Sequence, residues 1–429
     1  MFSLKKTLAG VLSCTMLLGS LVISGCSDSN TSGAQSADNT SNGSSTAHQG
    51  EIKDISSVEL VKDMKIGWSL GNTLDGGNEV NRGQAPGAIE KSWGNPDTTK
   101  EMIDEIKKAG FNVLRVPTTW DWSTGEAPEY KISDEWFARV KEIVDYGMEN
   151  DMYVILNIHH ETWHDPLEEN YEAASDRLKK VWTQIGNYFK DYDEHLIFEG
   201  LNEPRVRNSD EEWNGGSDAT REVVNKLDAD FVSTIRSLDG NNKLRHLMIP
   251  GYAASSSEVA LKALKIPEND DKLIVSVHAY IPYNFALSDN KRSNKWVACK
   301  EGFTNDIDNL ADMLKTLFTD KGQAVIIGEF GARSKDNEKY RAEWAKYYVT
   351  KMKTVGVPCV WWDNGAFTGS GELFGLFDRR NLEWRYPLLK DALISASNGE
   401  YTVDGLKSDT AILDELKKDI AQSKNSSAE

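Results

Sequence analysis

Between about residue 51 and residue 400, short apolar runs that suit buried strands alternate with amphipathic segments that suit helices. The apolar runs are continuous rather than alternating, which is typical of parallel strands whose two faces are both covered. The eight predicted strands cover residues 66–70, 113–116, 153–158, 196–201, 244–249, 273–277, 324–327 and 357–361. The pattern therefore predicts a parallel sheet covered by helices.

The amphipathic segments carry start and stop signals of helices. In the predicted helix 98–109 the apolar residues recur at helical spacing, Asp97 or Thr98 can serve as N-cap, and Gly110 follows the end. Ser133 opens the next predicted helix. Three further helices are predicted at residues 219–238, 305–318 and 338–355, followed by Gly240, Gly322 and Gly356 as stop signals.

Eight strands that alternate with helices over roughly 340 residues predict an α/β fold, a single (β/α)8 TIM barrel. We place this domain at residues 51–400. An open doubly wound sheet is the alternative. It would require a G-x-G-x-x-G turn after the first strand, and residues 67–71, G-W-S-L-G, lack that spacing.

The segments outside this domain have compositions of their own. Residues 1–25 carry Lys5 and Lys6, then an apolar stretch, and end just before Cys26, as in a bacterial lipoprotein signal peptide whose cysteine becomes the acylated N-terminus. The alternative is an ordinary secretory signal. Either one predicts an extracytoplasmic protein, and the first predicts a lipid anchor at Cys26 in the membrane.

Two polar segments flank the predicted barrel. Residues 26–50 are rich in Ser and Asn and contain no large apolar side chain, so we expect a flexible tether. At the other end, residues 401–429 predict a short amphipathic helix, 409–420, which packs on the outside of the barrel. A polar, disordered tail is predicted at residues 423–429.

The formal charge of −18 argues against nucleic-acid binding, which needs clustered basic residues. Removing residues 1–25 takes away two lysines and no acid, which makes the charge −20. A neutral or weakly polar substrate fits this balance. No C-x-x-C spacing occurs, so a zinc or redox framework is not supported. We expect Cys359 to be a small buried hydrophobe, and a Cys299–Cys359 disulfide remains an open alternative.

Polar side chains follow the predicted strands and should face one cavity at the carboxyl ends of the barrel strands. They are Arg115, His159, His160, Asn202, Glu203, His278, Tyr280, Glu329, Trp362, Asp363 and Asn364. Glu203 and Glu329 lie on strands 4 and 7, nearly opposite each other, and can flank a bound molecule. Cleavage of a glycosidic bond needs such a pair, one an acid and the other a carboxylate.

The two glutamates must differ in protonation to perform that chemistry. We expect Arg115 to keep Glu329 ionised, and the charge of Glu329 to raise the pKa of Glu203. Asn202 can hydrogen-bond a sugar 2-hydroxyl. Each residue also has a structural interpretation, in which the glutamates are solvated or cap helices and Arg115 is only an ion-pair partner.

The histidines allow two other interpretations. His159 and His160 can be satisfied core residues, or they can bind a metal together with His278 and a glutamate. Adjacent residues of a strand point to opposite faces, so His159 and His160 should not share one ion. We therefore expect neither a catalytic metal nor a cofactor.

Tryptophan is abundant, with thirteen in the chain. Those at or beyond predicted strand ends are Trp68, Trp93, Trp120, Trp122, Trp163, Trp213, Trp296 and Trp362. Flat aromatic faces suit the C–H faces of pyranose rings, so this set favours carbohydrate binding. The tryptophans within predicted helices, at positions 136, 182 and 344, are expected in the core.

An ordered set of motifs runs through the predicted barrel, one for most strands. They are I-G-W-S-L-G-N-T-L-D (66–75), R-V-P (115–117), L-N-I-H-H-E (156–161), L-N-E-P-R (201–205), V-H-A-Y (277–280), G-E-F-G (328–331) and W-W-D-N-G (361–365). This set resembles glycoside hydrolase family 5, and most closely its subfamily 4 of endoglucanases and xyloglucanases. The motifs depart from the family pattern at two positions. Ser69 stands where asparagine is expected, and Ala279 stands where tyrosine is common. These differences concern substrate preference and not the type of reaction.

The resemblance implies a retaining endo-β-1,4-glucanase that acts on β-glucan polysaccharides, with Glu203 as general acid/base and Glu329 as nucleophile. It implies supporting roles for Asn72, Asp75, Arg115, His159, Asn202, His278, Tyr280 and Trp362, and we include the adjacent His160 among these supporting residues. Tyr280 would orient the nucleophile, and Trp362 would form the floor under the sugar.

Two alternatives remain at the level of function. One is a xyloglucan-specific endoglucanase, which needs a cleft wide enough for xylose branches. The other is a non-catalytic surface lipoprotein that binds glycans, which would not need two opposed glutamates. We expect the protein to act as a monomer.

Overall fold

The computed structural model describes residues 48–414 and 416–418. Within them, eight parallel strands close into a barrel in the order of the sequence, from β1 beside β2 round to β8 beside β1. The barrel strands are β1 (Ile66–Leu70), β2 (Val113–Val116), β3 (Tyr153–Asn157), β4 (Leu196–Glu199), β5 (Leu247–Ser255), β6 (Leu273–His278), β7 (Ala324–Phe330) and β8 (Cys359–Asp363). The predicted (β/α)8 barrel is confirmed.

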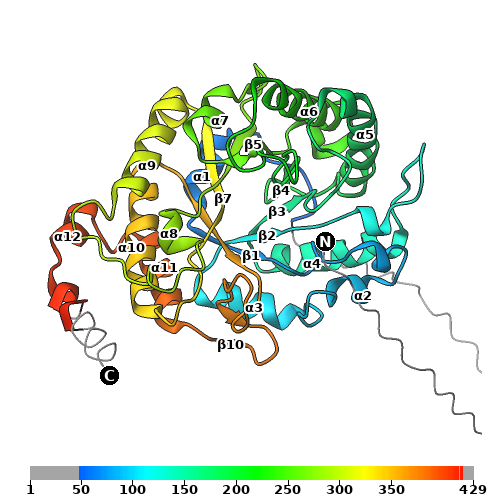
Figure 1. Cartoon of the computed structure of the whole chain (residues 1–429). Coiled ribbons are helices and arrows are strands. Elements are labelled where there is room, and N and C mark those ends of the chain that lie inside the picture. Colours follow the sequence, from blue (N-terminus) through cyan, green and yellow to red (C-terminus); the bar gives the residue numbers. More distant parts are fainter. Residues whose placement is uncertain (1–47, 415, 419–429) are drawn as a thin grey trace, which may run out of the picture. The chain divides into compact units, whose positions relative to one another are not determined.

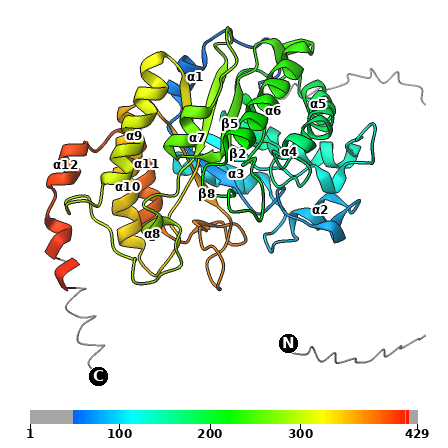
Figure 2. The ribbon, with the colours of Figure 1, turned by 45° about the horizontal axis from the view of Figure 1, so that its top comes forward.

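Helices surround the strands on the outside (Figure 1). Their bounds are α1 (Ser57–Asp63), α2 (Pro86–Glu90), α3 (Lys100–Ala109), α4 (Asp134–Glu149), α5 (Tyr171–Tyr188), α6 (Asp218–Ser237), α7 (Glu258–Ala263), α8 (Tyr283–Ala286), α9 (Asn305–Leu317), α10 (Glu338–Thr354), α11 (Pro387–Asn398) and α12 (Val403–Ser408). A small hairpin of β9 (Phe377–Asp378) and β10 (Glu383–Trp384) follows β8. Helices α10 and α11 pack side by side (Figure 2). No helix among the described residues has the length and apolar character needed to span a membrane.

Alternation along the strands separates two cores. Outward-facing residues such as Leu114 and Phe198 join the large core between strands and helices. Inward-facing residues such as Val113 and Ile197 form a second core inside the barrel. Helix α1 closes the base of the barrel, because its Leu60 belongs to that inner core. The barrel is therefore filled below the level of its polar residues.

Only β1 and β2 have the predicted bounds; β3, β4, β6 and β7 end one to three residues away from the predicted ends, and β5 and β8 also begin later than predicted. β5 starts three residues later than predicted and continues to Ser255, because its register shifts between Pro250 and Ser255 and interrupts the regular pattern. β8 starts after Pro358, since proline cannot donate a hydrogen bond to a sheet. As a result Trp362 and Asp363 lie within β8 rather than beyond it.

The helix signals were largely correct. Ser133 caps α4 as predicted, by accepting from the N–H of Trp136. The N-cap of α3 is Thr99, one residue after the predicted alternatives. Gly110 has a φ of 113° and ends α3, where a residue with a side chain would be strained.

The C-terminal part of the described chain contains the short helix α12 and, after it, helical residues within the predicted helix 409–420. Thr402 caps α12, and helical structure resumes at residues 411–414 and 416–418. Leu406 and Leu416 are buried against the barrel core, which confirms the predicted packing on the outside. The predicted signal peptide, Cys26, most of the tether and the tail 423–429 lie outside the described residues. Cys299 and Cys359 are both free thiols, and Cys359 is buried as predicted.

Candidate active site

A layer of buried polar side chains lies inside the barrel, directly above the apolar inner core. It is formed by Arg115, Asn157, Glu199 and Ser276, which all point inward from their strands. Glu199 accepts hydrogen bonds from Arg115 Nε and Asn157 Nδ2 through Oε2, at 2.8 and 2.9 Å. Its other oxygen, Oε1, accepts from Ser276 at 2.7 Å. This network forms a rigid base for the residues above it.

Glu329 is held at both oxygens. It lies near the end of β7 and is 5% exposed. Arg115 Nη1 donates to its Oε1 at 2.6 Å, and the hydroxyl of Tyr280 donates to its Oε2 at 2.7 Å. Arg115 lies within β2 rather than after it, so that its guanidinium reaches Glu329 from inside the barrel. The two donors fix the carboxylate in one orientation.

Glu203 follows β4 and is held by different partners. His278 Nδ1 lies 2.8 Å from its Oε1, and Arg205 Nη1 donates to its Oε2 at 3.3 Å. The neighbouring Asn202 accepts from Arg115 Nη2 at 2.7 Å. Arg115 therefore links the strand end that carries Glu203 to Glu329 across the barrel.

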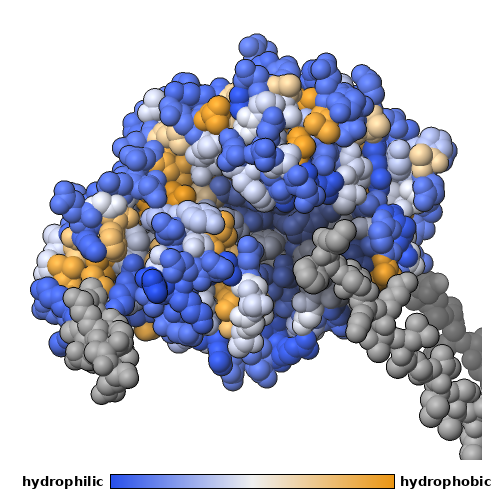
Figure 3. All heavy atoms as spheres, in the orientation of Figure 1, coloured by the Kyte–Doolittle hydropathy of each residue, from blue (hydrophilic) through white to orange (hydrophobic). Residues whose placement is uncertain are grey.

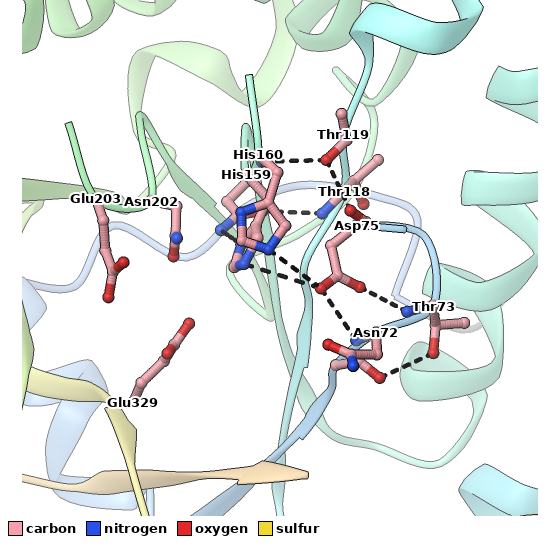
Figure 4. A network of polar contacts seen from close by, with 12 residues as sticks. Asn72, Thr73, Asp75, Thr118, Thr119, His159, His160, Asn202, Glu203 and Glu329 are labelled. Carbon is pink, nitrogen blue, oxygen red and sulfur yellow. Dashed lines mark hydrogen bonds and ion pairs between the residues drawn. The ribbon is translucent and has the colours of Figure 1, made fainter. Parts of the chain in front are cut away.

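The two glutamates face each other, as Figure 4 shows. Oxygen atoms of Glu203 and Glu329 and a ring nitrogen of His278 all lie within 4.8 Å of one another. His278 Nδ1 is 3.7 Å from Glu329 Oε2, so the imidazole lies between the carboxylates. This is close enough for two carboxyl groups to act on the same bond.

The predicted rise in the pKa of Glu203 is wrong for this structure. Burial raises the pKa of the Glu203 carboxyl, but the hydrogen bond from His278 and the positive charges of His278 and Arg205 outweigh it, so its pKa is lowered. For His278, burial lowers the pKa, but the charges of Glu329 and Glu203 outweigh it, so its pKa is raised. These opposite shifts favour the ion pair of a protonated His278 and an ionised Glu203.

The raised pKa of His278 predicts how the stability of the protein depends on pH. Because the pKa of His278 is raised, its contribution to stability is complete below its unfolded pKa of about 6.5 and is lost as pH rises through the folded value. The free energy of unfolding of wild type minus that of His278→Gln should therefore be smaller at about pH 9 than at about pH 6. Urea unfolding at each pH measures this difference.

His246→Gln is the matched control, because burial lowers the pKa of His246 to about 4. The free energy of unfolding of wild type minus that of His246→Gln should instead rise between about pH 5 and pH 7. A difference for His278→Gln that grows with pH would contradict the assignment.

Asp75 and the two histidines form a cluster beside the glutamates (Figure 4). Asp75 is fully buried and accepts hydrogen bonds from the N–H groups of Asn72 and Thr73. Its Oδ2 lies 4.0 Å from His159 Nε2 and 3.8 Å from His160 Nε2. Asp75 thus supports the histidines from behind, while Asn72 lines the cleft.

The prediction that His159 and His160 point to opposite faces is wrong. β3 ends at Asn157, so both residues lie beyond the strand, where side chains no longer alternate. Their rings meet edge to face at 4.3 Å. Together with Asp75 they place three potential ligand atoms within 4.8 Å of one another. This spacing would also suit a bound metal ion.

Three tryptophans line the cleft as predicted. Trp362 stacks in parallel with the ring of His159, with centroids 5.7 Å apart, while Trp93 and Trp213 are 42% and 61% exposed. Gly71 makes room for Trp362, since a Cβ there would come within 2.7 Å of its ring. The predicted sugar-binding role is wrong for Trp68, Trp120, Trp122 and Trp296, which are buried in the core. Core positions are confirmed for Trp136, Trp182 and Trp344.

The cleft itself has a volume of about 1160 Å³. It is lined by predicted residues Asn72, His159, His160, Asn202, Glu203, His278, Tyr280, Glu329, Trp362 and Asn364. Figure 3 shows the hollow in this face of the molecule. Asp363 does not line it. Its side chain accepts from the N–H groups of Leu376 and Phe377 and from the indole of Trp68, and so fixes the loop after β8.

Two important residues were missing from the predicted set. Glu199 lies inside the predicted apolar strand 196–201, and a carboxylate in such a strand indicates a buried polar partner. Arg205 was only noted within a motif, yet it contacts Glu203 and stacks on Trp213 at 4.3 Å. A sequence gives no direct sign of that stacking, because both residues lie on loops.

A (β/α)8 barrel with two facing glutamates in an open, aromatic-lined cleft at the carboxyl ends of its strands defines a glycoside hydrolase. The cellulase family, glycosyl hydrolase family 5, matches residues 75–368. The chain is 49% identical over 349 residues to endoglucanase B of Neocallimastix patriciarum, which covers 80% of this chain and 72% of that protein. It is 45% identical over 354 residues to endoglucanase A of Ruminococcus albus, covering 81% and 94%.

Solved structures agree with these relatives. A GH5-4 broad specificity endoglucanase from Ruminococcus champanellensis with bound cellotriose superposes with a TM-score of 0.77 at 43% identity, covering 80% of this chain and 99% of that one. A GH5 lichenase from Caldicellulosiruptor sp. F32 superposes with a TM-score of 0.76 at 42% identity, covering 81% and 97%. The chain belongs to glycosyl hydrolase family 5.

Proposed function

We propose that this glycoside hydrolase is a retaining endo-β-1,4-glucanase in which Glu329 is the nucleophile and Glu203 is the general acid/base. The observation that carries the proposal is the approach of the two carboxylates, whose oxygens come within 4.8 Å of each other. Retaining enzymes hold the pair about 5–5.5 Å apart, whereas inverting enzymes leave about 6.5–9.5 Å for a water molecule.

In the first step Glu329 attacks the anomeric carbon, and the bond to the leaving oxygen breaks. Arg115 and Tyr280 hold the attacking carboxylate in position. Glu203 gives a proton to the leaving oxygen, and His278, 2.8 Å away, supplies the proton that Glu203 needs. Asn202 is placed to bind the 2-hydroxyl of the sugar.

In the second step water replaces the leaving group. Glu203, now a carboxylate, takes a proton from water, which attacks the anomeric carbon and releases Glu329. The proton returns to the Glu203–His278 pair. Two inversions at one carbon give net retention.

The substrate is a β-1,4-glucan backbone that lies across the open cleft. Trp362 forms a flat floor beside the glutamates, and Trp93 and Trp213 extend the aromatic surface. An open cleft accepts internal segments of a polymer, as endo cleavage requires. The names of the similar proteins, broad specificity endoglucanases and a lichenase, support a substrate range that includes cellulose and mixed-linkage glucan.

Initial rates on carboxymethylcellulose, barley β-glucan, xyloglucan and mannan test this range. We expect the first two to be cleaved with a rapid fall in viscosity. Cleavage of xyloglucan alone would replace the proposal with a xyloglucan-specific enzyme. Binding without release of reducing ends on all four would favour a non-catalytic glycan-binding protein, which no feature of the site supports.

Trp213→Ala should raise KM for β-glucan about tenfold, because the exposed indole contributes about 1.4 kcal/mol of sugar stacking. The effect on kcat should be smaller and should arise through Arg205, which stacks on Trp213 and donates to Glu203. Steady-state kinetics on barley β-glucan measure both constants. Tyr188→Ala is the control, since Tyr188 is another exposed aromatic residue, on α5 and outside the cleft. An unchanged KM for Trp213→Ala would remove Trp213 from the binding surface.

The composition of residues 1–26 supports the further proposal that the mature enzyme is an extracytoplasmic lipoprotein anchored through Cys26. Bacterial cells that express the full chain should incorporate labelled palmitate into it, and Cys26→Ser should abolish the label. Equal labelling of both proteins would exclude the anchor, and unlabelled secreted protein would favour an ordinary signal peptide.

A further inference from the structure

A second cluster of histidine and carboxylate side chains lies at the base of the barrel, opposite the cleft. Asp151 precedes β3, and Asp193 and His195 precede β4, so all three lie at the amino ends of strands. His48 reaches them from the start of the described chain. Its carbonyl accepts from the N–H of Asp193 at 3.0 Å, and Gln49 forms an antiparallel bridge with Tyr192.

Three atoms of this cluster converge on one point. Asp151 Oδ1 lies 3.3 Å from His48 Nε2 and 3.8 Å from His195 Nε2, and the three atoms lie within 4.8 Å of one another. A tetrahedral zinc ion with bonds of about 2.0–2.1 Å holds its ligand atoms about 3.3 Å apart. The observed spacing needs only small side-chain adjustments. Asp151 can make them, since its side chain is 77% exposed.

Asp193 fixes which nitrogen of each ring faces this point. Its Oδ2 lies 2.9 Å from His48 Nδ1, and its Oδ1 lies 3.0 Å from His195 Nδ1. Its Oδ1 also accepts from the backbone N–H of His195 at 2.9 Å, and a carboxylate that bridges two imidazole rings in this way accepts from both. Both Nδ1 atoms must therefore donate. A carboxylate that orients a ligating histidine in this way is the usual second partner in metal sites.

This orientation brings three hydrogen-bond acceptors together, one each from His48, His195 and Asp151. In each neutral imidazole the Nε2 atom then carries a lone pair, and both lone pairs face the oxygen of Asp151. Acceptors at 3.3 and 3.8 Å require positive charge between them, supplied either by protons on the rings or by a cation. Two imidazoles and one carboxylate are a ligand set that suits zinc.

We propose that His48, His195 and Asp151 bind a zinc ion, with Asp193 as the residue that orients both histidines. Because His48 stands at the beginning of the described chain and the other ligands belong to the barrel, the ion would fasten that segment to the base of the domain. The site is separate from the proposed hydrolysis, which takes place at the other end of the strands.

The test measures zinc bound to the full chain after metal removal and titration with ZnCl2. We expect one zinc per chain at this site, a higher Tm with zinc, and visible absorption of a tetrahedral complex when Co²⁺ replaces it. Asp151→Asn, which keeps shape and solvent exposure, and His48→Gln should each lower zinc affinity at least about tenfold. Both variants should lose the increase in Tm and retain activity on β-glucan.

Glu51→Gln is the control, since Glu51 is exposed and close in sequence to His48 but outside the cluster. It should bind zinc as wild type does. The acidic and histidine side chains of the cleft provide the competing location. Zinc affinity that is unchanged in both Asp151→Asn and His48→Gln would place the metal elsewhere and overturn the proposal. Absence of zinc binding to wild type would leave protonated histidines as the source of positive charge and would also overturn it.

Discussion

Replacing Glu329 by glutamine is expected to lower kcat/KM on β-glucan by about 10⁴-fold or more, because the amide has no charge with which to attack the anomeric carbon. The change is nearly isosteric. Tyr280 and Arg115 still enclose the side chain, so the loss reports chemistry rather than a collapsed site. Initial rates on barley β-glucan, together with the Tm of each protein, measure the effect.

Glu372→Gln is the matched control for this experiment. Glu372 is another carboxylate in the same cleft, and burial raises its pKa. Among the described residues it forms no hydrogen bond or ion pair with either catalytic glutamate, so its substitution should lower kcat/KM less than about tenfold. A Glu329→Gln enzyme with a rate within about tenfold of wild type would exclude Glu329 as nucleophile.

Glu203→Ala should lower kcat/KM on β-glucan by about 10²–10⁴-fold, the usual contribution of a general acid. An aryl cellobioside whose phenolate leaves without a proton should lose far less in its first step. Its second step then becomes slow, because no base activates water. Added azide needs no base and should restore turnover.

The product formed with azide tests the stereochemistry. A retaining enzyme lacking its acid/base gives the β-glycosyl azide, since azide attacks the covalent intermediate from the face that water normally uses. Nuclear magnetic resonance distinguishes this product from the α-anomer. Formation of the α-anomer, or equal losses on β-glucan and on the activated substrate, would contradict the assigned role of Glu203.

The fold was predictable because its signals are local. Continuous apolar runs mark strands buried on both faces, and the bounds of β1 and β2 agree with the prediction to the residue. The prediction failed at β5, where the register shift after Pro250 is set by pairing with β6 and leaves no periodic trace in the sequence. Local patterns do not encode such long-range pairing.

The site was predictable in its members but less so in its electrostatics. Strand-end reasoning found Glu203 and Glu329, whereas the sign of the pKa shift of Glu203 depends on His278 lying 2.8 Å away. Burial and attraction oppose each other there, and only distances decide which is larger. The same limit explains Trp120, whose position after a strand suggested the cleft, although its indole donates to the carbonyl of Asn157 in the core.

The position of His48 has a practical consequence. The described chain enters the domain at the amino ends of the strands, whereas the cleft opens at their carboxyl ends. A solid support, a fluorescent protein or a second enzyme joined ahead of His48 would therefore leave the cleft unobstructed. Immobilisation through this end suits insoluble or very long polysaccharides, because the cutting face is presented outward to the polymer.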